Sequence, residues 1–277
     1  MTRIVCCQLH PVQADLAANR ELTRRAIAEA VAAGGKIVVL PELATSGYLF
    51  DSREEAASVA ITAQHDLFSD WAAEVSPGGS LVVGGFCELG EDGVLYNSAA
   101  VVDATGVVAV YRKTHLWDRE KLIFAAGTAE PPVLETAFGR LGVLICYDLE
   151  FPELTRALAL RGADLFVVPT NWPLVFRPPG ERPPEVIIAM AAARTNRVFI
   201  ACCDRTGTER GQEWTAGTTV IDECGWVLST VAEDGMAQAD IDLSLARTKA
   251  LSPLSDAFGD RRPELYTAVG AAPSVVG

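Results

Sequence analysis

The stretch GRLGVLICYDLEFPE, residues 139–153, begins as an apolar run and places Cys146 and Tyr147 where that run stops. Such a run is typical of a buried strand. Pro152 stands where the first turn of a helix over residues 152–161 would begin. Proline is well tolerated there because that N–H group has no intrahelical acceptor. The sequence therefore predicts a strand-to-helix turn that carries a thiol.

A thiol in this position has two interpretations. The positive end of a helix dipole favours the thiolate over the thiol, which would make Cys146 nucleophilic. Alternatively, Cys146 is a small buried core residue, a common role for a free cysteine. Asp148 and Glu150 beside it either stabilise the start of the helix or attract a cationic substrate. The choice depends on what the rest of the chain places near Cys146.

Composition narrows the class of protein. The 277 residues are 49% hydrophobic and 21% charged, which is sufficient for a packed core. The net charge of −13, without a cluster of Lys and Arg, argues against nucleic acid as a partner. No apolar run approaches the roughly 20 residues of a membrane-spanning helix. The N-terminal residues MTRIVCCQLH lack the pattern of a signal peptide, so we expect a cytoplasmic protein without a membrane partner.

The cysteines do not follow a metal-binding or disulfide pattern. Their number, seven, is odd, and no two have C-x-x-C spacing. The chain also lacks an H-E-x-x-H motif. We therefore expect no metal and no cofactor, and mostly reduced thiols in the core.

Predicted strands and helices alternate along the chain. A strand over residues 3–10, a helix from about residue 15 to residue 34 and the strand KIVVL form a β-α-β unit, which implies parallel strands. The same order returns as GRLGVLIC, a helix over residues 152–161 and DLFVVPTNW. The alternation favours sheets covered by helices.

The alternating pattern continues to about residue 241 without a linker or repeat. We therefore expect one domain over residues 1–241. Residues 242–277 form a C-terminal extension that contains Pro and Ala, and such a segment is either poorly ordered or packed on a neighbour.

Polar side chains follow three predicted strands. Glu42 follows KIVVL, Cys146 ends GRLGVLIC, and Asn171 and Trp172 end DLFVVPTNW. Because the carboxyl ends of parallel strands meet at one edge of a sheet, we expect these residues to converge there. Lys113, one of four lysines, follows the predicted strand VVAVYR. Its alternative role is that of a surface lysine at a strand end.

A nucleophilic thiol requires a base and a donor for the oxyanion. The chain has three histidines, and His115, close to Lys113, leaves a Cys-His enzyme open, although no local signature supports one. The better combination is Glu42 as base, Lys113 as oxyanion donor and Cys146 as nucleophile.

Three segments containing these residues occur in order as LPELATSGY, YRKTHLWDRE and GVLICYDLEFPE, followed by VVPTNW. In these motifs the chain resembles the nitrilase, or carbon-nitrogen hydrolase, superfamily over residues 3–241. The resemblance implies catalytic roles for Glu42, Lys113 and Cys146. It also implies one for Glu120 in HLWDREKLIF, whose alternative is a solvated loop charge.

The resemblance further implies an α/β fold, a four-layer α-β-β-α sandwich of two mixed sheets covered by helices. It implies a homodimer or larger homo-oligomer in which the helices near residues 152–161 and 184–196 pack across subunits. The extension from residue 242 would pack on the neighbouring subunit. The chain departs from the family at Thr195 and Asp204, where many members have an acidic residue and Asn respectively, so a substrate cannot be transferred from any one subfamily.

The activity implied is that of a cysteine-dependent hydrolase. It would cleave the C–N bond of a small aliphatic or ω-substituted amide to a carboxylic acid and ammonia through a thioester acyl-enzyme. The alternatives are an N-carbamoyl amine amidohydrolase, a nitrilase, or an inactive binding protein of the same fold. The chain length of the amide does not follow from the sequence. We expect the substrate to contact Tyr147, Trp117, Phe151, Asn171 and Trp172.

Overall fold

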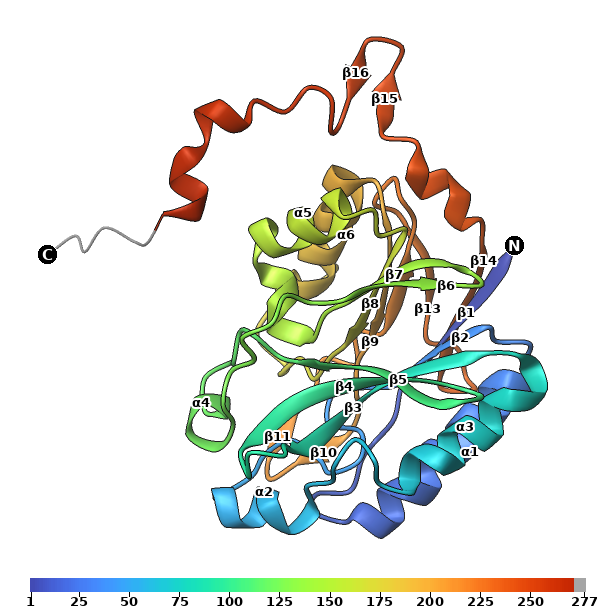
Figure 1. Cartoon of the computed structure of the whole chain (residues 1–277), viewed down its shortest axis with the longest axis vertical. Helices are drawn as coiled ribbons and strands as arrows, with labels where there is room; N and C mark the ends of the chain where they lie inside the picture. The colour runs from blue at the N-terminus through green and yellow to red at the C-terminus, as the bar shows by residue number, and fades with distance from the viewer. Residues whose placement is uncertain (272–277) are drawn as a thin grey trace, which may run out of the picture.

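Two six-stranded mixed sheets lie at the centre of the computed structural model, which describes residues 1–271 (Figure 1). In spatial order the first sheet contains β14 (Met236–Ile241), β1 (Thr2–Cys7), β2 (Ile37–Val39), β3 (Leu81–Leu89), β4 (Leu95–Asp103) and β5 (Gly106–Arg112). The second contains β13 (Val227–Thr230), β12 (Thr219–Ile221), β9 (Phe199–Cys203), β8 (Leu165–Pro169), β7 (Gly139–Val143) and β6 (Val133–Thr136).

Each sheet has parallel strands at its centre and antiparallel strands outside them. In the first sheet β1, β2 and β3 are parallel, and β14, β4 and β5 run antiparallel to their neighbours. In the second, β7, β8 and β9 are parallel, whereas β6, β12 and β13 are antiparallel to theirs. The carboxyl ends of the parallel strands therefore form one edge in each sheet.

Helices cover the outer face of each sheet (Figure 1). The first sheet is covered by α1 (Leu16–Ala32) and α3 (Leu67–Val75), and the second by α5 (Pro152–Leu160) and α6 (Pro184–Asn196). The shorter elements are α2 (Arg53–Val59), α4 (Glu120–Ile123), β10 (Thr208–Glu209), β11 (Gln212–Glu213), β15 (Ala250–Ser252), β16 (Ser255–Asp256) and 3₁₀ turns at Ser76–Gly78, Cys146–Glu150, Leu243–Arg247, Pro263–Leu265 and Thr267–Gly270.

Successive side chains of a strand point to opposite faces of its sheet, so each strand contributes to two core layers. In β1, Ile4 and Cys6 join the apolar cluster between the two sheets, while Val5 and Cys7 join the cluster under α1 and α3. All four side chains are at most 1% exposed. The α-β-β-α sandwich predicted from the sequence is confirmed.

The sequence signals that delimit the helices act as expected. The Asp15 side chain accepts a hydrogen bond of 2.9 Å from the Ala18 N–H and caps α1. Gly34, just beyond this helix, has φ +87°, a conformation that glycine adopts without strain. Pro152 is the first residue of α5. Local chemistry therefore sets these boundaries.

Strand β14 was not predicted from the sequence. It pairs with β1 along its whole length, from Thr2 opposite Ile241 to Cys7 opposite Met236. Its own burial pattern does not alternate, and its partner lies at the other end of the chain. Helix α2 and strand β6 were missed as well, because both are short segments between longer ones.

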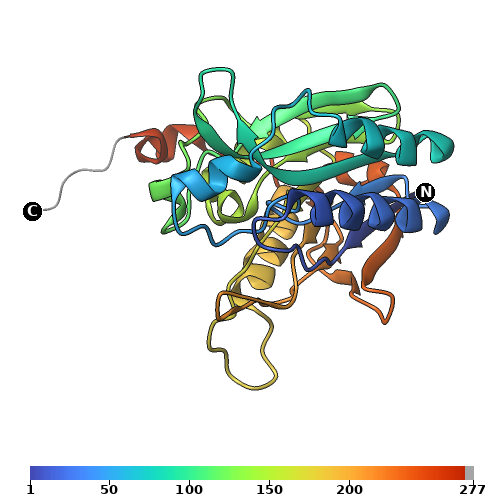
Figure 2. The ribbon, with the colours of Figure 1, turned by 90° about the horizontal axis from the view of Figure 1, so that it is seen from below.

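The C-terminal extension starts on the body of the molecule and then leaves it. Leu243 and Ala246 belong to the core, and Lys249 Nζ donates to the Asn196 and Arg197 carbonyl oxygens at the end of α6. Beyond this point the chain leaves the sheets, although Phe258 still packs against the core cluster (Figures 1 and 2). Leu254 in this part is 93% exposed. Residues 272–277 of the predicted extension lie outside the described residues.

Within residues 1–271, every helix is too short or too polar to cross a lipid bilayer.

Candidate active site

A lysine between two carboxylates lies at the carboxyl edge of the first sheet. Lys113, just after β5, has its Nζ 2.6 Å from Glu42 Oε1 and 2.8 Å from Glu120 Oε1. Glu42 follows β2, and Glu120 begins α4. Lys113 and Glu42 are fully buried, and Glu120 is 5% exposed. Because removing charges from water is costly, such a cluster is a candidate for function rather than for stability.

The Glu42 carboxylate is suited to accept a proton. Burial raises its pKa to about 7, with Lys113 opposing this rise and Glu120 adding to it. Oε1 accepts hydrogen bonds from Lys113 and from Asn97 Nδ2 at 2.7 Å. The buried Oε2 has no hydrogen-bond partner among residues 1–271. One oxygen is therefore held in place while the other remains available to a reacting group.

Cys146 lies at the carboxyl end of β7, at the start of the 3₁₀ turn Cys146–Glu150. It has φ +46°, a left-handed conformation that is unfavourable for a non-glycine residue by about 1–2 kcal/mol. Its neighbour Tyr147 has a backbone N–H with no acceptor among residues 1–271. The first N–H groups of a helical turn lack intrahelical acceptors, so this donor can bind an oxyanion.

Burial, rather than a helix dipole, determines the resting form of Cys146. Burial raises the pKa of its thiol well above the ordinary value. The charge of Glu42 raises it further, while Lys113 and the Asn171 backbone N–H lower it. The turn after Cys146 is short, so burial outweighs any helix dipole. The thiol keeps its proton until a base removes it, and Glu42, whose charge acts on this thiol, is the candidate base.

Asn171 and Trp172, at the end of β8, are buried behind this cluster. Asn171 Nδ2 donates a hydrogen bond of 2.8 Å to the Glu42 carbonyl oxygen. The Trp172 N–H donates to Asp204 Oδ1 at 2.9 Å. Both side chains are at most 3% exposed. These contacts support the backbone around Glu42, and the predicted contact of Asn171 and Trp172 with substrate stays a prediction.

Asp148 connects the nucleophile turn with the loop after β5. Its Oδ2 accepts from the Tyr111 hydroxyl at 2.8 Å and from the Ile145 N–H at 3.1 Å. Its Oδ1 accepts from Thr114 Oγ1 and from the His115 N–H, both at 3.0 Å. Asp148 is fully buried. It is therefore a link between the two sheets, and its contact with the Ile145 N–H places it at the N-terminus of the 3₁₀ helix, as one of the two sequence interpretations expected. Attraction of a cationic substrate stays a prediction.

His115 is held by the same carboxylate. Its Nδ1 lies 2.8 Å from Asp148 Oδ1, and its ring stacks on Phe151 with a centroid distance of 3.7 Å. These contacts show that His115 stabilises the loop after β5. Glu42 is therefore a better candidate base than His115, because the charge of Glu42 acts on the Cys146 thiol.

A cavity of about 330 Å³ opens beside Glu120. Trp117, 42% exposed, lines it, and its ring meets the edge of Tyr147, which in turn meets Phe151. Of the five predicted substrate-binding residues, only Trp117 is part of the cavity lining, whereas Tyr147 packs behind Trp117 and Phe151 packs against Tyr147. The full lining consists of Tyr48, Leu49, Phe50, Trp117, Asp118, Arg119, Glu120, Ile123, Phe124, Pro173, Val175, Gln212 and Trp214.

Tyr48 is a site residue that sequence reasoning missed. Its hydroxyl donates a hydrogen bond of 2.5 Å to Glu120 Oε1, the oxygen that also binds Lys113. Its ring meets Trp214 edge-on with a centroid distance of 5.4 Å. Tyr48 ends the motif LPELATSGY, so its position in that motif was the available signal.

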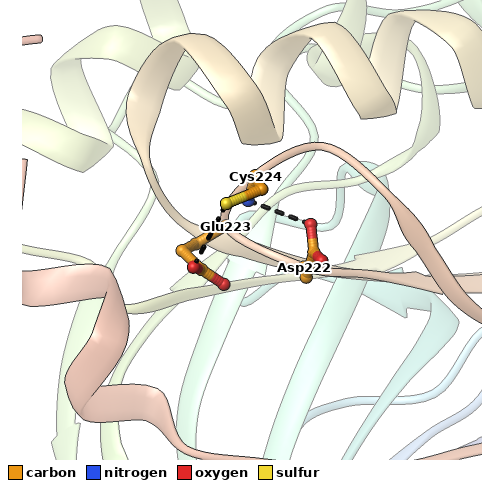
Figure 3. A group of neighbouring side chains, drawn as sticks. All are labelled: Asp222, Glu223 and Cys224. Carbon is orange, nitrogen blue, oxygen red and sulfur yellow. Dashed lines mark hydrogen bonds between the residues drawn. The ribbon is translucent and has the colours of Figure 1, made fainter. Parts of the chain in front are cut away.

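A second cluster of possible ligands lies in the turn between β12 and β13. One possible metal-ligand atom from each of Asp222, Glu223 and Cys224 lies within 4.8 Å of the other two (Figure 3). The Cys224 N–H donates to Asp222 Oδ1 at 2.9 Å, which closes the turn. Arg197 Nη1 donates to Glu223 O and to Cys224 Sγ, both at 3.0 Å. A guanidinium group already supplies the positive charge here, so the cluster is explained as a stabilised hairpin.

Comparison with known proteins assigns the family. The chain belongs to the carbon-nitrogen hydrolase family, whose model matches residues 3–250. It is 35% identical to a protein named nitrilase from Pyrococcus abyssi, over 96% of this chain and 99% of that one. It is 33% identical to an (R)-stereoselective amidase from a Pseudomonas species, over 94% and 91% of the two chains.

Solved structures agree with this assignment. An amidase from Nesterenkonia sp. AN1 superposes with a TM-score of 0.77 at 28% identity, covering 96% of this chain and 98% of that one. A variant of that amidase has been solved with acrylamide added at its active-site cysteine. This chain therefore has the architecture of a family in which at least one member carries out chemistry at a cysteine.

Proposed function

We propose that this protein is an amidase that hydrolyses a small amide to a carboxylic acid and ammonia, with Cys146 as nucleophile. The observation that carries the proposal is the buried Glu42–Lys113 pair beside a protonated thiol. A base with a pKa of about 7 is suited to proton transfer near neutral pH. Relatives named as amidases support the choice of an amide.

The proposed reaction begins with proton transfer from the thiol to Glu42. The sulfur attacks the amide carbonyl carbon and gives a tetrahedral intermediate. Its oxyanion accepts hydrogen bonds from Lys113 Nζ and the Tyr147 N–H, and one such donor contributes about 3–4 kcal/mol to transition-state stabilisation. The C–N bond then breaks as Glu42 returns its proton to the leaving nitrogen, and ammonia departs.

The second half of the reaction hydrolyses the thioester. Glu42, again ionised, accepts a proton from a water molecule whose oxygen attacks the thioester carbonyl. The C–S bond breaks, the acid leaves, and Cys146 regains a proton from Glu42. Glu120 and Tyr48 hold Lys113 in line for both oxyanions, which is a positioning role.

A nitrile is the second candidate substrate, because the relative from Pyrococcus abyssi is named nitrilase. An N-carbamoyl amine is the third. The test is ammonia release from propionamide, glutaramate, 5-aminopentanamide, propionitrile and N-carbamoylputrescine by the unmodified chain and by Cys146→Ala. We expect release from amides, lost in Cys146→Ala and retained in Cys224→Ala, a matched control at the hairpin cysteine.

Release from propionitrile alone would replace the amidase by a nitrilase, and release of carbon dioxide from the carbamoyl compound would indicate the third activity. Absence of any release, together with a Cys146 that iodoacetamide does not alkylate, would favour an inactive binding protein of the same fold.

The proposal includes a homodimer or larger homo-oligomer. Because the extension begins on its own core with Leu243 and Ala246, the part proposed to pack on a neighbouring subunit is the one that follows Lys249. Exposed apolar side chains on α5 and α6 support it, since Leu160 is 45% and Ile187 48% exposed. The apolar residues Leu251, Leu254, Leu265 and Val269 of the extension are exposed as well. A cytoplasmic location is also proposed, supported by seven cysteines that are all free.

A further inference from the structure

We propose that the cavity beside Glu120 accepts an uncharged apolar acyl chain, so that the preferred substrate is a neutral aliphatic or aromatic amide rather than one with a carboxylate or an amine at the far end of its chain. This inference rests on the proposed amidase function and specifies its substrate class. It also separates this chain from relatives named 2-oxoglutaramate amidase and omega-amidase.

The walls of the cavity are mainly aromatic and aliphatic. Tyr48 and Trp214 form one side, where their rings meet edge-on, and Phe50 and Phe124 meet in the same way with a centroid distance of 6.1 Å. The other apolar lining residues are Leu49, Trp117, Ile123, Pro173 and Val175. Contact with such walls is favourable for a hydrocarbon chain in proportion to the apolar area that it removes from water.

Each charged side chain that lines the cavity is either hydrogen-bonded to another residue of the chain or exposed to solvent. Glu120 binds Lys113 and Tyr48. Asp118 and Arg119 are adjacent, opposite in charge and exposed to solvent. Among residues 1–271, the cavity is therefore lined by no buried cation that could bind a carboxylate and by no free buried carboxylate that could bind an amine.

A second buried cation, Arg205, lies behind Trp214 and is covered and neutralised. Arg205 Nη1 forms an ion pair with Glu209 Oε2, and its guanidinium group lies 4.6 Å from the centre of the Trp214 ring. Glu209 Oε1 in turn accepts hydrogen bonds from the N–H groups of Tyr48, at 3.0 Å, and Leu49. The Arg205–Glu209 pair thus fixes the aromatic wall from behind, and Trp214 separates its charge from the cavity.

A charged chain end would lose hydration against these apolar walls, and the lining charges that are not already bonded, Asp118 and Arg119, are exposed to solvent and offer it only a screened partner. An unpaired charge is strongly disfavoured in apolar surroundings. The net charge of −13 disfavours an anionic substrate further. The volume of about 330 Å³ is at the lower end of small-molecule sites, roughly 300–1,000 Å³, which suits a short chain.

The first test compares kcat/KM for four amides. Propionamide reports the chemistry without a long chain, and hexanamide, adipamate and 6-aminohexanamide share a six-carbon acyl chain with a neutral, anionic or cationic end. We expect hexanamide to exceed both charged amides by at least tenfold. Equal or better turnover of a charged amide, with propionamide hydrolysed, overturns the inference but leaves the amidase intact. If propionamide and the other amides are all inert, the proposed function fails and the inference fails with it.

The second test places a cation on the cavity wall. In Val175→Arg, the ratio of adipamate to hexanamide turnover is expected to rise about tenfold. Val108→Arg is the matched control, because Val108 is similarly exposed, 49% against 45%, and lies on β5 outside the cavity lining. An unchanged ratio in Val175→Arg, or the same rise in Val108→Arg, overturns the inference.

Discussion

The two sheets contribute different chemistry to the same site. The first sheet supplies the charged groups, Glu42 after β2 and Lys113 after β5, whereas the second supplies the thiol of Cys146 after β7 and the amide of Asn171 after β8. Neither sheet holds a complete set of reacting groups. The site therefore exists only when the two sheets are held in one fixed relation.

Apolar packing alone does not fix that relation. The core between the sheets is stabilised by the hydrophobic effect, which is not directional. The hydrogen bonds of Asn171 with the Glu42 carbonyl and of Asp148 with Tyr111 and Thr114 are directional, and they cross from one sheet to the other. These bonds set the position of the charged half of the site relative to the thiol.

The largest effect is expected from neutralising the base of the first sheet. Glu42→Gln keeps the shape and an oxygen for Lys113 but cannot accept a proton, so kcat/KM should fall by about 10²–10⁴-fold. Steady-state ammonia release measures this. Glu88→Gln is the control, since Glu88 is a buried carboxylate of the same sheet that pairs with Arg112 outside the site. An equal loss of activity in both variants would mean that removing any buried charge from the first sheet lowers activity, and it would contradict a specific role of Glu42 as base.

Removing the cation should affect both activity and stability. Lys113→Ala removes an oxyanion donor, for an expected loss of about 10²–10³-fold in kcat. It also leaves Glu42 and Glu120 buried without their partner, which should lower the free energy of unfolding by about 3–5 kcal/mol. Urea denaturation and kinetics measure the two effects. Lys121→Ala, at an exposed lysine of α4, should change neither, and a stable Lys113→Ala variant would contradict the ion-pair account.

The pH dependence should come from the first sheet. The pKa of Glu42 is raised to about 7, chiefly by burial, and only the ionised carboxylate accepts the thiol proton. Activity should therefore fall as pH decreases through 7, and kcat/KM at pH 5 should be about 100-fold below its plateau. Circular dichroism at each pH controls for unfolding. A profile that stays flat between pH 5 and 8 would exclude Glu42 as the base.

Weakening the link between the sheets should reduce activity less. Asp148→Asn replaces an acceptor oxygen by a donor, and a loss of about 1–3 kcal/mol in positioning corresponds to about 5–150-fold in kcat. The decline near pH 7 should remain, because Glu42 is intact. Asp164→Asn is the control, a buried aspartate at the opposite end of the second sheet that accepts from the Arg140 N–H. Unchanged kinetics in Asp148→Asn would show that packing suffices to align the sheets.

The smallest effect on the site itself should come from the C-terminal extension. A chain that ends at Lys249 keeps Leu243 and Ala246 in the core and the lysine contacts at the end of α6. We expect its thermal unfolding to change little and its oligomer to become smaller in size-exclusion chromatography with light scattering. An unchanged oligomer would contradict the packing of the extension on a neighbouring subunit.

The sequence could predict the residues that local patterns mark, but not the contacts between distant parts of the chain. Glu42, Lys113 and Cys146 each follow a recognisable strand, so local patterns sufficed to nominate them. The Asp148 network depends on the left-handed conformation of Cys146 and on how the second sheet faces the first. The contact of Tyr48 with Glu120 joins residues that are 72 apart in the chain. Such contacts depend on which distant strands the fold brings together, which no local pattern encodes.

The protonated state of Cys146 has a consequence for oxidative damage. Peroxides attack thiolates, and burial raises the pKa of this thiol well above the ordinary value. Cys6, Cys7, Cys87, Cys202 and Cys203 are buried with raised pKa values too. These six thiols therefore present little thiolate to an oxidant, and the Cys146 sulfur becomes strongly nucleophilic only when its proton passes to Glu42 in front of a bound substrate.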